Sequence, residues 1–310
     1  MVAPKSFAFS FSNVFAYKSD RALLLGSRDY EIDSGEDTGC FFAWVDGAWT
    51  TDDLPFAAAD VIVATSPKPT VVCMATDGRI VTRSGVTFER ELVDATEDGP
   101  HRFGGLRELR SIGGVPYAVG MARTAYRRDE ANRWTRIDRG LRSDDATDDS
   151  GLNSIDGSPD GMELLAVGWG GELWRRTSDV WTQLASPTTR TLFKIVRLRD
   201  GSYLAAGQTG TLVHISGSVA REVQHNATKA DFYGLNVFRD QVYLATTEGL
   251  FLWSSGRCEP LAIKSKKKIR FDDGDSFGDL HSTDDMIWSV GPKLAMFSTD
   301  GATWRETPYR

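Results

Sequence analysis

Cysteine and histidine are both scarce in this 310-residue sequence, with three and four copies. Cys40, Cys73 and Cys258 lie too far apart for a CxxC pair or a zinc site, and an odd number gives no disulfide framework. The histidines show no HxH or HExxH spacing. We therefore expect no metal and no cofactor, and the cysteine usage favours a reducing compartment.

Long apolar runs are also missing. No stretch approaches the roughly 20 apolar residues of a membrane-spanning helix. Near the amino terminus, Ser6, Ser10, Ser12 and Asn13 interrupt the apolar residues, so the hydrophobic core of a signal peptide is not formed. From these absences we predict a cytoplasmic protein that does not bind membranes.

Sustained helical periodicity is absent too, and a short phrase recurs in its place. It consists of an apolar run, a turn with glycine, a second apolar run, and a polar turn followed by an aromatic residue. Seven copies align, 39 to 49 residues apart, on Gly26, Ala75, Gly120, Gly168, Gly207, Thr246 and Gly291. A period of about 44 residues is that of a four-stranded propeller blade. The sequence therefore predicts an all-β fold: a single seven-bladed β-propeller domain of four-stranded antiparallel blades over residues 1–310.

The polar turns carry a family resemblance. Ser298 to Trp304, STDGATW, resembles a shortened Asp box, and Arg83 to Phe88 resembles a degenerate copy. The chain is thus similar to the BNR/Asp-box β-propeller superfamily, which includes sialidase-like and photosystem II assembly factor-like propellers. The resemblance implies a fold and no single activity. It also implies that the Asp and Gly of the box shape a tight turn and that its Trp packs between blades.

Two closures of the ring are open at this point. Thr303 to Thr307 is predicted to form the outer strand of the seventh blade, while Phe7, Phe9 and Phe11 alternate ahead of the first inner strand. These phenylalanines either pair onto the neighbouring blade and seal the ring, which we favour, or lengthen the inner strand.

Charge is the feature that points to a partner. With 36 basic and 43 acidic residues the net charge is −7, which gives no general reason to bind nucleic acid. Five long segments, predicted to lie on one face, hold 20 of the acidic residues and three arginines, a net charge of about −17. They are residues 29–39, 52–60, 94–104, 138–150 and 271–279. This segregation favours a basic protein partner, and the alternative is that exposed loops are acidic only for solubility.

The predicted partner-binding residues are carboxylates of these segments together with Trp169, whose turn does not require a large aromatic side chain. Packing against the next blade is the other explanation for Trp169. The residues are Asp29, Glu31, Asp33, Glu36, Asp37, Asp52, Asp53, Glu97, Asp98, Asp144, Asp145, Asp148, Asp149, Trp169, Asp272, Asp273 and Asp275.

The function predicted from these features is non-enzymatic binding of a basic protein through an acidic face. A narrower hypothesis is a bacterial immunity protein that neutralises a cognate toxin, such as a nuclease domain. The alternative is a sialidase-like glycoside hydrolase or a glycan-binding lectin. That enzyme would need three inward arginines and a tyrosine nucleophile, and Arg110, Arg197 and Tyr233 are candidates that match no motif, so no catalytic residue is predicted.

Overall fold

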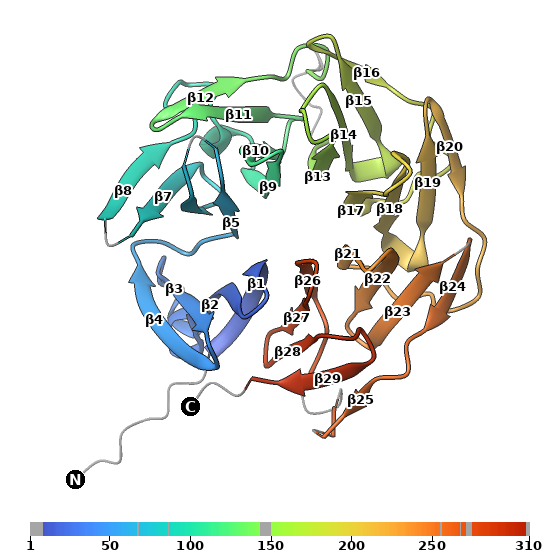
Figure 1. Cartoon of the computed structure of the whole chain (residues 1–310). Coiled ribbons are helices and arrows are strands. Elements are labelled where there is room, and N and C mark those ends of the chain that lie inside the picture. Colours follow the sequence, from blue (N-terminus) through green and yellow to red (C-terminus); the bar gives the residue numbers. More distant parts are fainter. Residues whose placement is uncertain are drawn as a thin grey trace.

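The computed structural model describes residues 9–66, 68–85, 87–142, 150–254, 256–266, 268–270 and 275–307. Seven antiparallel sheets, each with four strands consecutive in the chain, follow one another around a ring (Figure 1). One sheet has a fifth, parallel strand at its edge. The predicted seven-bladed propeller is confirmed.

The first three blades take the first twelve strands. They are β1 (Phe9–Lys18), β2 (Arg21–Arg28), β3 (Gly39–Val45) and β4 (Ala48–Leu54); β5 (Asp60–Ala64), β6 (Thr70–Met74), β7 (Arg79–Ser84) and β8 (Thr87–Leu92); and β9 (Leu106–Ile112), β10 (Val115–Gly120), β11 (Ala125–Glu130) and β12 (Arg133–Arg136).

The remaining four blades follow the same order from the inner to the outer strand. They are β13 (Leu152–Gly157), β14 (Glu163–Gly168), β15 (Leu173–Thr177) and β16 (Val180–Gln183); β17 (Leu192–Arg197), β18 (Tyr203–Gly207), β19 (Leu212–Ser216) and β20 (Val219–Glu222); β21 (Gly234–Phe238), β22 (Gln241–Thr246), β23 (Gly249–Ser254) and β24 (Arg257–Pro260); and β26 (Asp279–Ser282), β27 (Ile287–Gly291), β28 (Leu294–Ser298) and β29 (Thr303–Glu306).

In the described ranges, four short helical elements lie between strands. They are α1 (Asp29–Ser34), η1 (Pro100–Arg102), η2 (Trp169–Gly171) and η3 (Gln208–Gly210). Strand β25 (Lys264–Ser265) pairs in parallel with β29.

The recurring phrase marks the second strand of each blade, which is the most buried one. All five residues of β18 are buried, whereas five of the six residues of the outer strand β8 are exposed. Glycine ends the phrase because an added Cβ at Gly168 or Gly207 would collide with the carbonyl oxygen of Gly151 or Thr191. The phrase therefore reflects strands covered on both faces and a close approach of backbones at their ends.

The hydrophobic core is a ring of seven layers, one between each pair of neighbouring blades. One cluster, for example, joins Leu164 and Trp174 of the fourth blade to Tyr117 of the third. Another joins Leu24 of the first blade to Trp288 of the seventh. Stability therefore depends on every blade packing against two others.

The ring is not sealed by strand exchange, and the favoured closure is wrong. Phe9 and Phe11 lengthen β1, which pairs with β2, and Phe7 lies outside the described residues. The outer place in the last blade is filled by β29, and the edge beyond it by β25. The first and last blades meet instead through packing and through the Phe11 N–H, which donates to the carbonyl oxygen of Pro292 at 3.0 Å.

The turn before β29 has the geometry that the resemblance implies. The backbone N–H groups of Thr303 and Ala302 donate to Asp300 Oδ1 at 2.6 and 2.8 Å, and these bonds lower the pKa of Asp300. Gly301 adopts a φ of 79°. Trp304 is buried between the sixth and seventh blades.

Candidate functional site

The acidic segments share one end of the blades, here called the loop face. Residues 29–39, which include α1, connect the second and third strands of the first blade. The other four segments fall between the outer strand of one blade and the inner strand of the next. In a propeller of this topology both kinds of connection lie on the same side of the ring, and the turns between strands one and two and between strands three and four form the opposite hairpin face.

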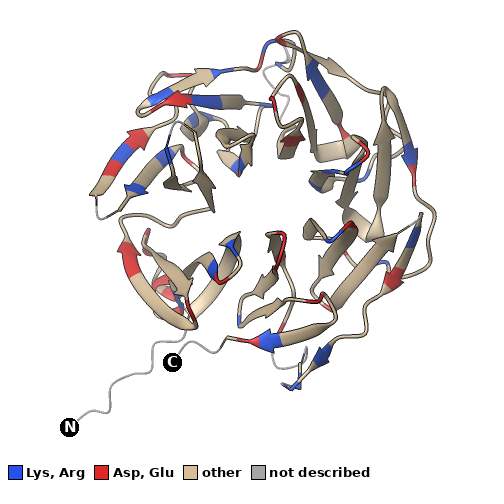
Figure 2. Ribbon diagram, in the orientation of Figure 1, with Lys and Arg blue, Asp and Glu red and all other residues tan. Residues whose placement is uncertain are grey.

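Many loop-face carboxylates are neutralised by arginines and a lysine outside the five segments. Figure 2 shows such mixing of basic and acidic residues on the strands of the second and third blades. The pairs that involve predicted site residues have N–O distances of 2.5 to 2.8 Å and are Lys293–Asp29, Arg28–Glu31, Arg28–Asp53, Arg79–Asp37 and Arg83–Asp52. The charge of the segments alone therefore overstates how negative this face is.

Two predicted site residues are buried. Glu31 is 4% exposed and accepts hydrogen bonds from Arg28 and from the Tyr30 hydroxyl. Asp275 is buried and accepts a hydrogen bond from the backbone N–H of Arg270 at 2.9 Å. In the unbound protein these two carboxylates hold their own loops.

Other predicted carboxylates are open to solvent. Asp33, Glu36 and Glu97 are exposed and form no ion pair with any residue in the described ranges. Asp98 is exposed and lies 3.9 Å from Arg142. Asp144, Asp145, Asp148, Asp149, Asp272 and Asp273 lie outside the described residues.

Large apolar side chains are exposed on the same face. Trp169 is 40% exposed in η2, and Tyr233, which precedes β21, is 43% exposed. The Tyr233 ring stacks on Phe193 at 5.5 Å. Tyr30 and Ile32 project from α1 and are more than half exposed. Exposed Trp and Tyr side chains are enriched at protein-binding surfaces.

Sequence reasoning found Trp169 but missed Tyr30, Ile32 and Tyr233. The insertion that carries α1 has six helical residues, too few for a helical period to be recognised. Tyr233 was assessed only as part of a hydrolase site. The available signal was position: Tyr30 lies within the connection 29–39, and Tyr233 ends the connection between β20 and β21.

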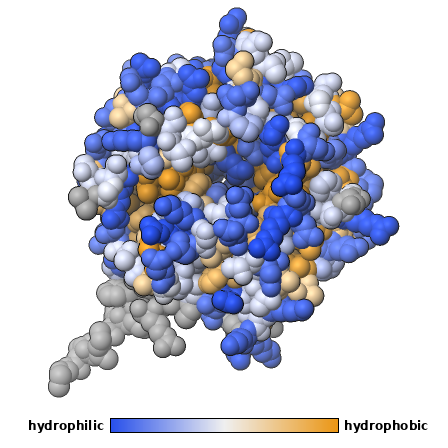
Figure 3. Space-filling model, in the orientation of Figure 1, coloured by the Kyte–Doolittle hydropathy of each residue, from blue (hydrophilic) through white to orange (hydrophobic). Residues whose placement is uncertain are grey.

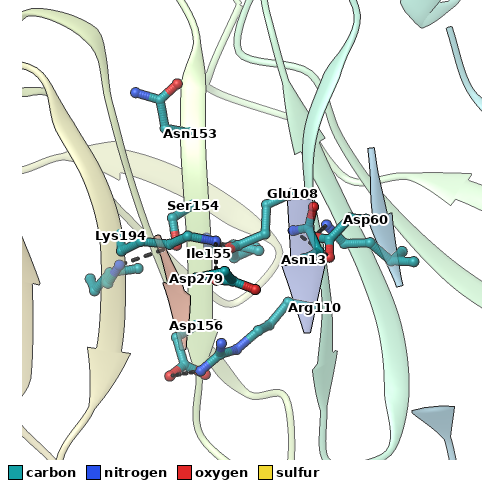
Figure 4. Close-up of polar contacts among 12 residues, drawn as sticks. Asn13, Asp60, Glu108, Arg110, Asn153, Ser154, Ile155, Asp156, Lys194 and Asp279 are labelled. Atoms are coloured by element: carbon teal, nitrogen blue, oxygen red, sulfur yellow. Dashed lines mark hydrogen bonds and ion pairs between the residues drawn. The ribbon is translucent and has the colours of Figure 1, made fainter. Parts of the chain in front are cut away.

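The centre of the ring holds a cluster of polar side chains, here called the channel cluster, with one member from each inner strand. Figure 4 shows part of it. Its members are Asn13, Asp60, Glu108, Ser154, Lys194, Asn236 and Asp279. Most of them bond the backbone of an adjacent blade: Leu109 N–H donates to Asp60 Oδ2 and Ile155 N–H to Glu108 Oε2, both at 2.8 Å.

Lys194 provides the positive charge of the channel cluster. Its Nζ lies 2.9 Å from Glu108 and 3.9 Å from Asp279. Burial acts to lower the pKa of Lys194, but the attraction of Glu108, Asp279 and Asp60 outweighs it and raises that pKa. Burial also raises the pKa of Asp60 to about 7. The cavity between these residues has a volume of about 30 Å³, so the cluster ties blades together and leaves no space for a substrate.

The candidate hydrolase residues do not converge. Arg110 and Arg197 lie near the hairpin-face ends of β9 and β17, whereas Tyr233 lies at the loop-face end of β21. The Arg110 guanidinium bonds Asp156 at 3.2 Å, and the backbone N–H of Arg197 bonds the same carboxylate.

The three cysteines are buried free thiols. Burial raises the pKa of Cys40 to about 11 and those of Cys73 and Cys258 to about 12. They are therefore unreactive near neutral pH. In the described part of the chain, no three His, Cys, Asp or Glu side chains are grouped as a metal site would require.

None of the helices in the described ranges combines the length and apolar character needed to cross a membrane.

Seven four-stranded blades define a β-propeller, and one of its faces carries exposed aromatic residues and carboxylates. No protein-family model matches the sequence. The chain is 29% identical over 268 residues to the immune protein Tsi7 of Pseudomonas aeruginosa, and the match covers 84% of this chain and 85% of that protein.

Solved structures share the fold at low identity. The WD40 propeller domain of Doa1 has a TM-score of 0.67 and 12% identity, with 95% of this chain and 94% of that chain covered. The structure of YCF48 bound to a D1 peptide has a TM-score of 0.62 and 14% identity, with 93% of this chain and 90% of that chain covered. Chaetomium thermophilum Raptor has a TM-score of 0.64 and 9% identity. The match covers 94% of this chain but only 29% of the Raptor chain. These likenesses concern the fold alone.

Proposed function

We propose that this chain is an immunity protein that binds a cognate protein toxin through its loop face and thereby neutralises it. The observation that carries the proposal is the similarity to immune protein Tsi7, which extends over 84% of the chain. A match of this extent covers most of the propeller. Binding alone is sufficient for such a role, because a partner that covers a toxin's active cleft excludes its substrate.

The proposed toxin surface is basic and contains a hydrophobic centre. Asp33, Glu36 and Glu97 are exposed carboxylates without ion pairs among the described residues, so a basic side chain can reach them without displacing an arginine. Trp169 and Tyr233 supply the apolar contact area on which affinity depends. We include Asp144, Asp145, Asp148, Asp149, Asp272 and Asp273, which lie outside the described residues, because in the sequence they fall between an outer strand and the next inner strand.

The first experiment identifies the partner and tests neutralisation separately. The tagged chain is used to purify partners from its source cells at about 50 mM and about 500 mM salt, since screening at high salt weakens charge-driven association. Each partner is then expressed in a heterologous host with and without this chain, and growth is measured. Rescue from a toxic partner supports immunity, and failure to rescue from any bound partner would exclude it.

A charge-reversal variant tests the binding face. Asp33→Lys/Glu36→Lys/Glu97→Lys should lower the association rate with the toxin by about 10-fold or more at low salt and should weaken rescue. The matched control is Glu130→Lys/Asp284→Lys, which reverses two exposed charges of the hairpin face. Equal rescue by both variants would place the toxin elsewhere even if immunity itself holds.

A further inference from the structure

A groove of about 690 Å³ opens on the hairpin face, away from the proposed toxin surface. Its walls come from the ends of β1 and β5, the start of β6 and the turn between β9 and β10. The apolar residues of these walls include Phe15, Tyr17, Val63, Pro69 and Val71. In Figure 3, apolar surface lies beside the central opening of the ring within a mostly hydrophilic face. The volume and the apolar walls are those of a small-molecule site.

Two hydrogen-bond donors line the polar part of this groove. Among the described residues, the Arg110 guanidinium makes one hydrogen bond, to Asp156 Oδ2 at 3.2 Å, although it carries five N–H groups. His281 Nδ1 accepts the backbone N–H of Ala16 at 3.1 Å, so the ring proton is on Nε2. The His281 ring also lies 4.0 Å from the ring of Phe15, which joins the donor region to the apolar wall.

The lining of the groove is cationic. Its charged residues in the described chain are Lys18, Arg83, Arg110 and Asp156. Arg83 is paired with Asp52, which lies outside the groove, and Lys18 is exposed at the rim. Asp156 is already engaged, since it accepts hydrogen bonds from Arg110 and from the backbone of Arg197 and Gly157. An anion in the groove therefore meets a guanidinium with unused N–H groups and, at the rim, the exposed ammonium of Lys18.

We propose that this groove binds a small carboxylic acid with an aromatic or aliphatic body, whose carboxylate is held by Arg110 and His281 and whose body lies against Phe15, Tyr17 and Val63. The carboxylate takes the unused N–H groups, and the body removes apolar surface from water. The site is independent of the proposed immunity function, because it lies at the opposite end of the blades and needs no toxin.

The test measures binding of 4-phenylbutyrate and of its uncharged analogue 4-phenylbutan-1-ol to the isolated chain by titration calorimetry. 4-Phenylbutyrate should bind, and the alcohol should bind at least about 10-fold more weakly because a charged hydrogen bond is lost. Arg110→Gln should weaken binding of 4-phenylbutyrate by about 10-fold or more and leave binding of the alcohol unchanged. Lys18→Glu, a substitution at an exposed position, should weaken binding of 4-phenylbutyrate and leave binding of the alcohol unchanged.

The matched control is Arg199→Gln, an exposed arginine of the same face whose partner is Asp240 and which does not line this groove. It should bind 4-phenylbutyrate like the unmodified chain. Absence of 4-phenylbutyrate binding, equal binding of the alcohol, or unchanged affinity in both Arg110→Gln and Lys18→Glu would each overturn the proposal.

Discussion

Trp169 occupies a turn whose geometry depends on its neighbours and not on the indole. Gly170 and Gly171 adopt φ values of 60° and 76°, and a Cβ on Gly171 would collide with the carbonyl oxygen of Thr188. The next blade builds the same turn as η3, with Gln208 in the place of Trp169. A half-exposed Trp in such a turn contributes little to folding and is available to a partner.

Replacing Trp169 by glutamine, the residue at the same place in the next blade, separates binding from folding. Trp169→Gln should leave the melting temperature nearly unchanged and weaken the toxin complex by about 10-fold or more, because the aromatic contact area is lost. Met162→Gln, at an exposed apolar position of the hairpin face, is the control and should affect neither property. A large drop in melting temperature for Trp169→Gln would show that the indole instead packs the blade.

Between strands, a buried ion pair joins the second and third blades. Arg128 of β11 donates two hydrogen bonds to Glu91 of β8, at 2.9 and 2.6 Å, and the indole N–H of Trp134 donates a third at 3.2 Å. Both charged side chains are almost completely buried. Removing either side chain leaves the other as a buried charge with no opposite charge beside it.

Glu91→Ala should therefore lower the free energy of unfolding by about 3–5 kcal/mol, measured by urea denaturation. The comparison variant Glu130→Ala breaks the exposed pair with Arg133 and should change stability by less than about 1 kcal/mol. Similar losses in both variants would mean that the buried pair has no special role in joining the blades.

At the scale of the whole ring, the channel cluster links stability to pH. Burial raises the pKa of Asp60 to about 7 in the folded protein, from an ordinary value of 3.8. Between these two pKa values, Asp60 is therefore protonated in the folded state and deprotonated in the unfolded state. This stabilising contribution is complete below about pH 4 and is lost as the pH rises through about 7.

Asp60→Asn should flatten this dependence, since an amide does not titrate. The urea midpoint of the unmodified chain should fall more steeply between about pH 4 and about pH 7 than that of the variant, which has a lower overall stability because one acceptor oxygen is replaced. Asp284→Asn, in an exposed turn, is the control and should retain the full slope. Parallel curves for Asp60→Asn and the unmodified chain would contradict the assignment.

Strand order and blade number could be predicted from the sequence because they follow from local patterns. The apolar runs of the second strands, several of which end in a glycine such as Gly168 or Gly207, recur every 39 to 49 residues, and each blade is built from consecutive strands. Trp304 after its Asp-containing turn was predictable for the same reason.

Only the tertiary structure decided what depends on contacts between blades. The closure of the ring, the neutralisation of loop carboxylates by Arg28 and Lys293, and the channel cluster all join residues that lie far apart in the chain. A charge count over segments cannot include an arginine that reaches the segment from a strand. Local pattern therefore determined the blades, whereas their packing around the ring determined which charges and aromatic side chains remain free to bind a partner.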